Sequence, residues 1–322
     1  MDVSNQGFDA GAATFGCALY DKESRKLYFF YTGASDKNFT RASIGLAIST
    51  DFINFKKLNE PVLSCEDLNF KELVTPTVFR VGNYFYMAFA CRPFNKGRRI
   101  CLAFSDDPKG PWNFIKVIAE PEYLWEGNNI DLEPCSIKIS ENEVLIYYSN
   151  VNNKLVEKIL RPRYWFSTFW LRRIGILKLK IRSPKDVEAF KFKGNPLMHL
   201  NGGKGSWNES LFCPGCLRIE ENYFLFPSAS TYSIGFPYKQ YIGIIIDSTP
   251  YFTSPKFIGV LIDGPSEKKQ IIPNIKSEIA LDTPSPIIVE DKLYLYYAVM
   301  DRADNVWKTA LTIFFVSGRA YK

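Results

Sequence analysis

The chain has 322 residues, 46% of them apolar and 16% aromatic, and a formal net charge of +6. This length and apolar content suffice for a large buried core, either as one repeat-built domain or as two ordinary domains. No run of about 18 apolar residues occurs, and the first residues lack a basic stretch followed by a hydrophobic one, so neither a transmembrane helix nor a secretory signal is expected.

Five β-hairpins are expected along the chain. Each expected hairpin has an apolar stretch, a short polar turn and an aromatic-rich stretch, which is typical of two antiparallel strands joined by a tight turn. The aromatic side chains favour this interpretation because they pack well on a pleated surface. The copies occupy residues 15–33 (FGCALYDKESRKLYFFYTG), 76–91, 134–150, 214–230 and 284–299.

A third strand is expected after each hairpin, and a fourth after some of them. The third strands are predicted at residues 43–51, 99–107, 173–183, 241–249 and 308–316, the last with a weaker pattern. Fourth strands are indicated within residues 52–63 and 190–200. No stretch shows a sustained period of 3.6 residues that ends in helix caps, so helices are not expected.

These units recur along the whole chain. Their first residues are separated by steps of 61, 58, 80 and 70, as marked by Phe15, Pro76, Pro134, Pro214 and Pro284. An antiparallel unit of three or four strands repeated at about 40–80 residues is typical of a propeller blade. The sequence therefore predicts an all-β, five-bladed propeller in one domain, residues 1–322. The blades are expected at about 8–70, 71–128, 129–206, 207–278 and 279–322; a pair of β-sandwiches would not explain five similar hairpins.

The positive charge is concentrated in residues 154–193, which hold twelve Lys or Arg and three acids. This segment could contact an anion, a nucleic acid or a membrane surface. We favour a solvated pair of strands instead, because apolar and basic residues alternate in IGILKLKIRS.

The seven cysteines favour buried free thiols. Most lie in apolar, strand-like runs, and their odd number without a signal peptide argues for a reducing, cytoplasmic setting. Cys213 and Cys216 form a C-x-x-C pair, but no second pair completes a zinc site.

Acidic residues stand just before each expected innermost strand. In a propeller these positions meet at one mouth of the central channel, where pockets commonly form. Converging carboxylates repel one another, which raises the pKa of at least one of them and suits glycoside hydrolysis. The alternative is that the acids pair with Lys71, Arg92, Arg98 or Arg99 and only close the channel. The residues in question are Asp9, Glu72 beside Lys71, Asp131 with Glu133, Glu209 and Asp282.

Three segments of the sequence resemble the opening blades of the five-bladed propeller glycosidases of families 43, 32, 68, 117 and 130, and those of family 43 most. These segments are FDAGAATFG, IGLAISTDFINFKKLNEPVL and TPTVFRVGNYFYMAFA. The resemblance implies an inverting glycosidase with a base Asp on blade one, a pKa-tuning Asp on blade three and an acid Glu on blade four. By position these roles fall on Asp9, Asp131 and Glu209. The sequence departs from the family pattern in that Asp9 precedes no proline, Glu133 rather than Asp131 abuts its proline, and Phe212 occupies the usual place of the acid Glu.

The sequence thus favours a glycoside hydrolase acting on a small oligosaccharide or glycoside. A phosphorylase like those of family 130 and a non-catalytic propeller that binds a sugar or a protein stay open as alternatives. No metal or cofactor is expected, since the single histidine, His199, precludes a multi-histidine site. Neither a nucleic acid nor a membrane is expected as a partner, and the oligomeric state is left open. The residues expected to bind substrate are Lys71, Glu72, Arg92, Glu133, Trp207 and Asp282.

Overall fold

The computed structural model describes the chain except residues 153–170, 232–238, 265–278, 302–304 and 317–322. The described residues form antiparallel strands and two short 3-10 helices, η1 (Leu124–Glu126) and η3 (Met198–Leu200), which confirms the predicted all-β class. No helix in the described part of the chain is long and apolar enough to span a membrane.

The strands follow one another in five groups, each a meander in which consecutive strands pair. The first is β1 (Ala12–Asp21), β2 (Lys26–Ala34), β3 (Ala42–Ser49) and β4 (Lys56–Lys57), and the second is β5 (Glu72–Val81), β6 (Tyr84–Arg92), β7 (Arg99–Ser105) and β8 (Asn113–Ala119). The third is β9 (Asn129–Lys138), β10 (Glu143–Asn152), β11 (Ile174–Ile181) and β12 (Val187–Lys191). The fourth is β13 (Ser210–Ile219), β14 (Asn222–Thr231), β15 (Lys239–Asp247) and β16 (Lys256–Asp263), and the fifth is β17 (Ile279–Val289), β18 (Lys292–Asp301) and β19 (Val306–Phe315).

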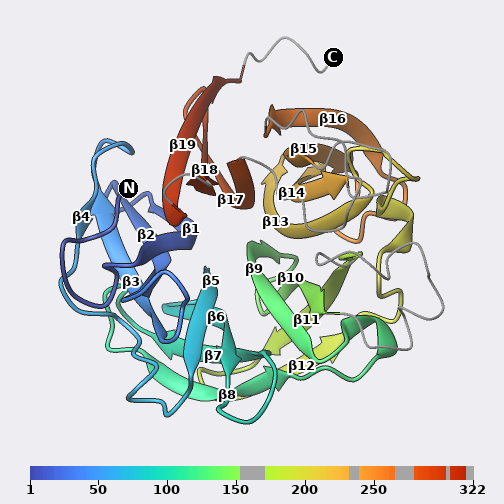
Figure 1. Cartoon of the computed structure of the whole chain (residues 1–322). Helices are drawn as coiled ribbons and strands as arrows, with labels where there is room; N and C mark the ends of the chain where they lie inside the picture. Colours follow the sequence, from blue (N-terminus) through green and yellow to red (C-terminus); the bar gives the residue numbers. More distant parts are fainter. Residues whose placement is uncertain (153–170, 232–238, 265–278, 302–304, 317–322) are drawn as a thin grey trace.

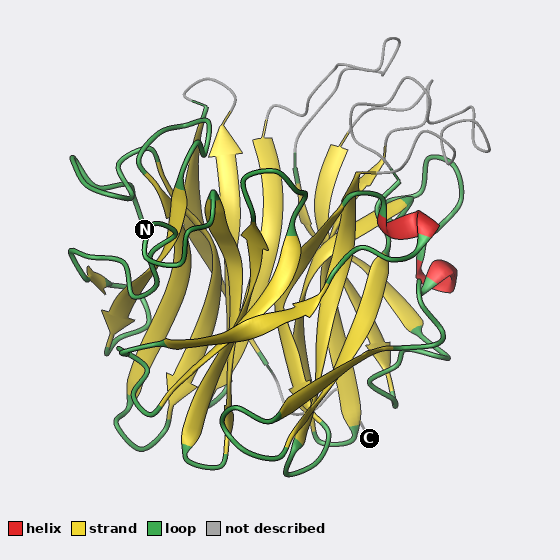
Figure 2. Ribbon diagram, turned by 90° about the horizontal axis from the view of Figure 1, so that it is seen from below, coloured by secondary structure: helices red, strands yellow, loops and turns green. Residues whose placement is uncertain are grey.

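The five groups are arranged around a common centre, with the first strand of each group innermost (Figure 1). Each innermost strand contacts the next, from β1 through β5, β9 and β13 to β17, and β17 contacts β1. The first two groups are joined into one sheet by a single parallel pair, Ala42 with Glu72. The strands run through the thickness of the molecule, so that loops gather at both of its ends (Figure 2).

Apolar side chains fill the space between neighbouring groups. Five buried clusters of described residues each join mainly two adjacent groups, because both faces of these sheets are covered and their strands are apolar on both sides. Representative pairs that share a cluster are Phe30 with Met87, Tyr86 with Tyr148, Leu145 with Leu225, Phe226 with Leu295, and Tyr296 with Phe29. The last pair connects the final group to the first.

The hairpins and third strands lie where the sequence predicts them, whereas the fourth strands do not. Residues 52–63 contribute only the two-residue β4, and β12 begins before the indicated segment 190–200. β8 and β16 have no counterpart in the sequence prediction. These outer strands are more exposed than the inner ones, and although their segments NFIKVIA and KFIGVLID are apolar, they lie outside the repeated hairpin pattern. Residues 153–170, which hold part of the basic segment, lie outside the described residues.

The interpretation of the cysteines as free thiols is wrong for four of the seven. Disulfides join Cys91 to Cys101 on adjacent strands and Cys135 to Cys216 across two groups, with Cα atoms 6.0 and 5.0 Å apart. Cys17, Cys65 and Cys213 are free and buried. The sequence could not reveal the second bridge because its halves are 81 residues apart and meet only through the packing of β9 on β13.

The innermost strands share a bulge that shapes the centre of the molecule. Pairing with the second strand shifts register at the same place in β1, β5, β9, β13 and β17. In four of them the bulged residue has positive φ, between 45° and 50°: Phe15, Thr75, Cys213 and Thr283. Such a conformation is rare for residues other than glycine and is typical of strands that redirect a side chain toward a site. The bulged residue directly precedes Gly16, Pro76, Pro214 or Pro284.

Candidate functional site

All four of these residues line a central cavity of about 440 Å³. The residues around it come from all five innermost strands, from β6 and β19, and from the loops beside them. It is lined by Phe15, Asn38, Phe39, Thr40, Lys71, Glu72, Val74, Thr75, Arg92, Arg98, Asp131, Arg172, Cys213, Asp282, Thr283 and Trp307. The cavity therefore combines three carboxylates, four cations and three aromatic rings.

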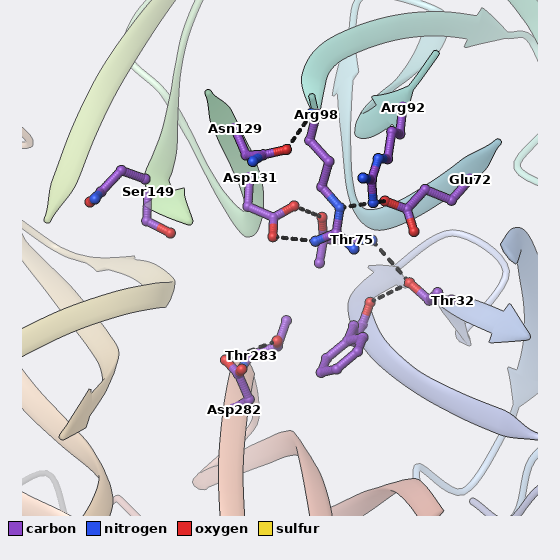
Figure 3. Close-up of polar contacts among 12 residues, drawn as sticks. Thr32, Glu72, Thr75, Arg92, Arg98, Asn129, Asp131, Ser149, Asp282 and Thr283 are labelled. Atoms are coloured by element: carbon purple, nitrogen blue, oxygen red, sulfur yellow. Dashed lines mark hydrogen bonds and ion pairs between the residues drawn. The ribbon is translucent and has the colours of Figure 1, made fainter. Parts of the chain in front are cut away.

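Arg98 joins two of the carboxylates (Figure 3). Its Nε donates to Glu72 Oε1 at 2.7 Å, and its Nη1 donates to Asp131 Oδ2 at 2.6 Å. The main-chain N–H of Arg98 donates to Asn129 Oδ1 at 2.8 Å, which fixes the loop ahead of β7 against β9. Burial opposes ionisation of Glu72, but the guanidinium groups of Arg98 and Arg92 outweigh it and hold the pKa of Glu72 below its ordinary value. Glu72 and its arginine partner are therefore charged at neutral pH.

Asp282 has the opposite electrostatic environment. It lies on β17, and burial raises its pKa above the ordinary value, although the positive charge of Arg172 and the N–H of Thr283 act against this. Asp131 is near enough to add to the rise by charge repulsion. The N–H of Thr283 donates to Asp282 Oδ1 at 2.7 Å. The cavity thus holds carboxylates whose pKa values are displaced in opposite directions, as acid–base chemistry requires.

Arg172 is held at the side of the cavity by the third group. Its Nη2 donates to Ser149 Oγ at 2.7 Å, its Nε donates to the carbonyl of Asn150 at 2.9 Å, and its guanidinium lies 4.5 Å from the ring centroid of Phe212. These contacts fix its position, so it contributes a stationary positive charge next to Asp282.

An aromatic wall closes another side of the cavity. The ring centroid of Phe15 lies 4.9 Å from that of Trp307 and 5.8 Å from that of Phe39. Rings at these distances pack in tilted arrangements and offer an apolar surface beside the charged groups. Such a surface suits the apolar face of a sugar.

Six of the residues named in the sequence analysis meet in this cavity: Lys71, Glu72, Arg92, Arg98, Asp131 and Asp282. Three of the ion pairs that the sequence left as an alternative are present as well, from Arg98 and Arg92 to Glu72 and from Arg98 to Asp131. Arg92 Nη1 lies 3.6 Å from Glu72 Oε1, farther than Arg98.

Asp9 does not line the cavity. Its carboxylate is buried against the first group, where Oδ2 accepts from Lys57 Nζ at 2.7 Å and from the Tyr31 hydroxyl at 2.9 Å. The position in β1 that matches the bulge of the other innermost strands holds Phe15 instead. The first group of strands therefore contributes no carboxylate to the residues that line the cavity.

Glu209 and Trp207 do not line it either. Glu209 is fully buried and its Oε2 accepts from the N–H of Gly205 at 3.1 Å. Trp207 packs over Gly243 of β15, where a Cβ atom would lie 2.0 Å from the indole ring. Both side chains contribute to the packing of the loop before β13. Glu133 lies at the bulge of β9, and its side chain is outside what the structure describes.

No group of three or more His, Cys, Asp or Glu side chains is placed to hold a metal ion among the residues that the structure describes. Two of the three cavity carboxylates are already paired with Arg98.

The fold was compared with known proteins. Three solved structures are similar over nearly the whole chain. The first is a thermostable family-43 glycoside hydrolase, with a TM-score of 0.61 and 14% identity over 98% of this chain and 94% of that one. An α-L-arabinanase of Cellvibrio cellulosa complexed with arabinohexaose has a TM-score of 0.58 and 16% identity over 96% of this chain and 94% of that one, and the family-43 endo-arabinanase of Bacillus licheniformis has a TM-score of 0.57 and 14% identity over 98% of both chains. The predicted resemblance to family 43 is confirmed at the level of the fold. No protein-family model and no curated protein matches the sequence.

Proposed function

We propose that the chain is a single five-bladed β-propeller, residues 1–322, whose blades are the five strand groups. The closed order of contacts between innermost strands and the apolar clusters between neighbouring groups support this proposal. So does the likeness to family-43 structures over almost the full chain. The strand groups lie within the blade limits 8–70, 71–128, 129–206, 207–278 and 279–322.

We propose further that the protein hydrolyses the glycosidic bond of a small oligosaccharide or glycoside held in the central cavity. The observation that carries this proposal is that three carboxylates line one cavity, and that burial raises the pKa of one of them, Asp282, in a fold shared with glycoside hydrolases. Glycoside hydrolysis needs one protonated and one ionised carboxyl group beside the bond. The cavity volume, about 440 Å³, is suited to a small ligand.

In this proposal Asp282 is the proton donor to the departing oxygen, since its raised pKa keeps it protonated over a wider range of pH. Asp131 is the carboxylate that activates the attacking water. Its Oδ2 is held by Arg98, whereas its Oδ1 has only a longer contact, 3.5 Å, with the Thr75 hydroxyl and can accept a proton from water. These assignments replace the roles that the sequence gave to Asp9 and Glu209, and the resemblance to family 43 implies inversion at the anomeric carbon.

The test is a screen of aryl glycosides with and without inorganic phosphate, followed by Asp282→Asn and Asp131→Asn. Each substitution is expected to lower kcat/KM by about 10²–10⁴-fold while the melting temperature shows that the variant folds. Asp9→Asn and Glu209→Gln are matched controls, since they remove a carboxylate outside the cavity. Full activity in Asp282→Asn would refute its assigned role, and turnover that requires phosphate would show a phosphorylase.

A non-catalytic carbohydrate-binding propeller is the second candidate. It is favoured by Phe15, which occupies the bulge of β1, and by Arg98, which neutralises both Glu72 and Asp131. Binding of oligosaccharides without cleavage of any glycoside in the screen would establish this candidate in place of the hydrolase.

A further inference from the structure

A second hollow adjoins the central cavity and has a different character. This groove has a volume of about 690 Å³ and lies on the loops that follow β6 and precede β9. Arg92 lines both the groove and the cavity, so a ligand that fills the cavity can continue into the groove. The groove is lined by Arg92, Phe94, Asn95, Lys96, Gly97, Arg99, Pro121, Gly127, Asn128 and Asn129.

The charged side chains that line this groove are all cations: Arg92, Lys96 and Arg99. Arg92 is only the more distant partner of Glu72, which Arg98 already pairs at 2.7 Å. Lys96 is exposed and forms no ion pair with the described residues. Arg99 pairs at 3.1 Å with Glu120, whose side chain is half exposed. The groove therefore presents excess positive charge to a ligand.

Phe94 adds an apolar surface to the groove. Its side chain is 52% exposed, and the guanidinium of Arg41 lies 5.7 Å from the ring centroid. An exposed aromatic ring of this kind is a typical contact for the apolar face of a sugar ring, and the amides of Asn95 and Asn128 can donate to and accept from hydroxyl groups.

We propose that the groove binds an acidic sugar unit, bearing a carboxylate or a sulfate, of the same oligosaccharide whose glycosidic bond lies in the central cavity. This inference rests on the proposed hydrolase function. A nucleic acid fits less well, because Phe94 is the one aromatic residue among those that line the groove, whereas proteins that bind single strands stack successive bases on several rings. The acidic group contacts Lys96 and Arg92, and the ring of the same sugar lies on Phe94.

The test measures binding by calorimetry to the full-length protein. The probes are a trisaccharide of galacturonic acid, the same trisaccharide with its carboxyl groups reduced to alcohols, a sulfated trisaccharide, inorganic phosphate and a short single-stranded DNA. The variants are Lys96→Glu and Phe94→Ala, neither of which touches the cavity carboxylates. Lys22→Glu is the matched control, since it makes the same charge change on an exposed lysine in the turn after β1, at the far end of that strand from the cavity.

We expect at least one acidic trisaccharide to bind about tenfold more tightly than the reduced one. Lys96→Glu is expected to raise the Kd of the acidic trisaccharide about tenfold and to raise the Kd of the reduced trisaccharide much less. Lys22→Glu should change neither Kd. Phe94→Ala should weaken all three sugars alike. Equal binding of acidic and reduced sugars, no binding of any sugar, or binding of phosphate or DNA alone would overturn the inference. Because binding is measured without turnover, acidic sugars that bind but are never cleaved would refute only the hydrolase proposal.

Discussion

Replacing Arg98 with methionine leaves Glu72 and Asp131 as two carboxylates without their shared cation. Their side chains are 3% and 8% exposed, and that of Arg98 is 23% exposed. Removing one partner from a buried ion pair costs about 3–5 kcal/mol because the remaining charge is left uncompensated. Since Arg98 is partly solvated and Arg92 stays near Glu72, we expect the low end, about 3 kcal/mol at neutral pH.

The loss should depend on pH with a definite sign. In the wild type the pKa of Glu72 lies below its ordinary value, so this group stabilises the fold above that ordinary value and ceases to do so as the pH falls through the folded-state pKa. In Arg98→Met, burial without the guanidinium should raise the pKa of Glu72. The difference in free energy of unfolding between the two proteins should therefore be widest at neutral pH and should narrow as the pH falls and Glu72 becomes protonated.

The assay is urea unfolding followed by tryptophan fluorescence at several pH values. Arg92→Met is the control, because its side chain is 40% exposed and lies 3.6 Å from Glu72, and we expect it to cost less than about 1 kcal/mol. Adding Glu72→Gln and Asp131→Asn to Arg98→Met should restore most of the lost stability. A loss that is the same at pH about 4 and about 7 would refute the electrostatic reasoning and assign the cost to packing.

Three further outcomes are expected. Asp9→Asn should lower the free energy of unfolding by about 2–3 kcal/mol, because it breaks the buried ion pair with Lys57 and weakens the hydrogen bond from the Tyr31 hydroxyl. It should leave kcat/KM within about twofold, and a large fall in activity without a loss of stability would contradict the placement of Asp9 outside the cavity. Gly243→Ala should lower the melting temperature by several degrees, since the added methyl group meets the Trp207 ring, and an unchanged melting temperature would show that the indole moves freely. Serine at both ends of the disulfide between β9 and β13 should cost about 4 kcal/mol in urea unfolding because that bridge spans 81 residues, and a loss under about 1 kcal/mol would show that packing alone holds these strands.

The inner strands could be predicted from the sequence because their side chains are buried on both faces. Apolar runs broken by short polar turns give a local signal, and each predicted hairpin appears as a pair of strands, from β1 and β2 to β17 and β18. The outer strands β8 and β16 are apolar as well, NFIKVIA and KFIGVLID, but neither belongs to the repeated hairpin pattern by which the inner strands were predicted.

The site could be predicted in part. Glu72, Asp131 and Asp282 each stand one to three residues before the first bulged residue of their strand, and this place in the strand was enough to bring them together. Asp9 and Glu209 stand four or more residues before theirs, in the loops that precede β1 and β13, and contact other partners there.

Arg172 is the cavity arginine that the sequence analysis missed, whereas Arg98 was named as a possible partner of the acids. Both are the first residue of an Arg-Arg-Ile phrase at the start of a third strand, β7 or β11. This shared phrase was a signal that could have placed Arg172 at the cavity as well. The exact partners of the two arginines depend on how neighbouring groups of strands pack, which a local pattern does not contain.

The positive-φ residue that recurs in the innermost strands lets a strand keep its pairing with the next strand and still present a side chain to the cavity. At Phe15, Thr75, Cys213 and Thr283 the backbone leaves the pairing register between the first and second strands. All four line the same cavity, each from a different strand. The internal repeat has thus produced four equivalent positions at the cavity, where a side chain can be exchanged without disturbing the strand pairing around it.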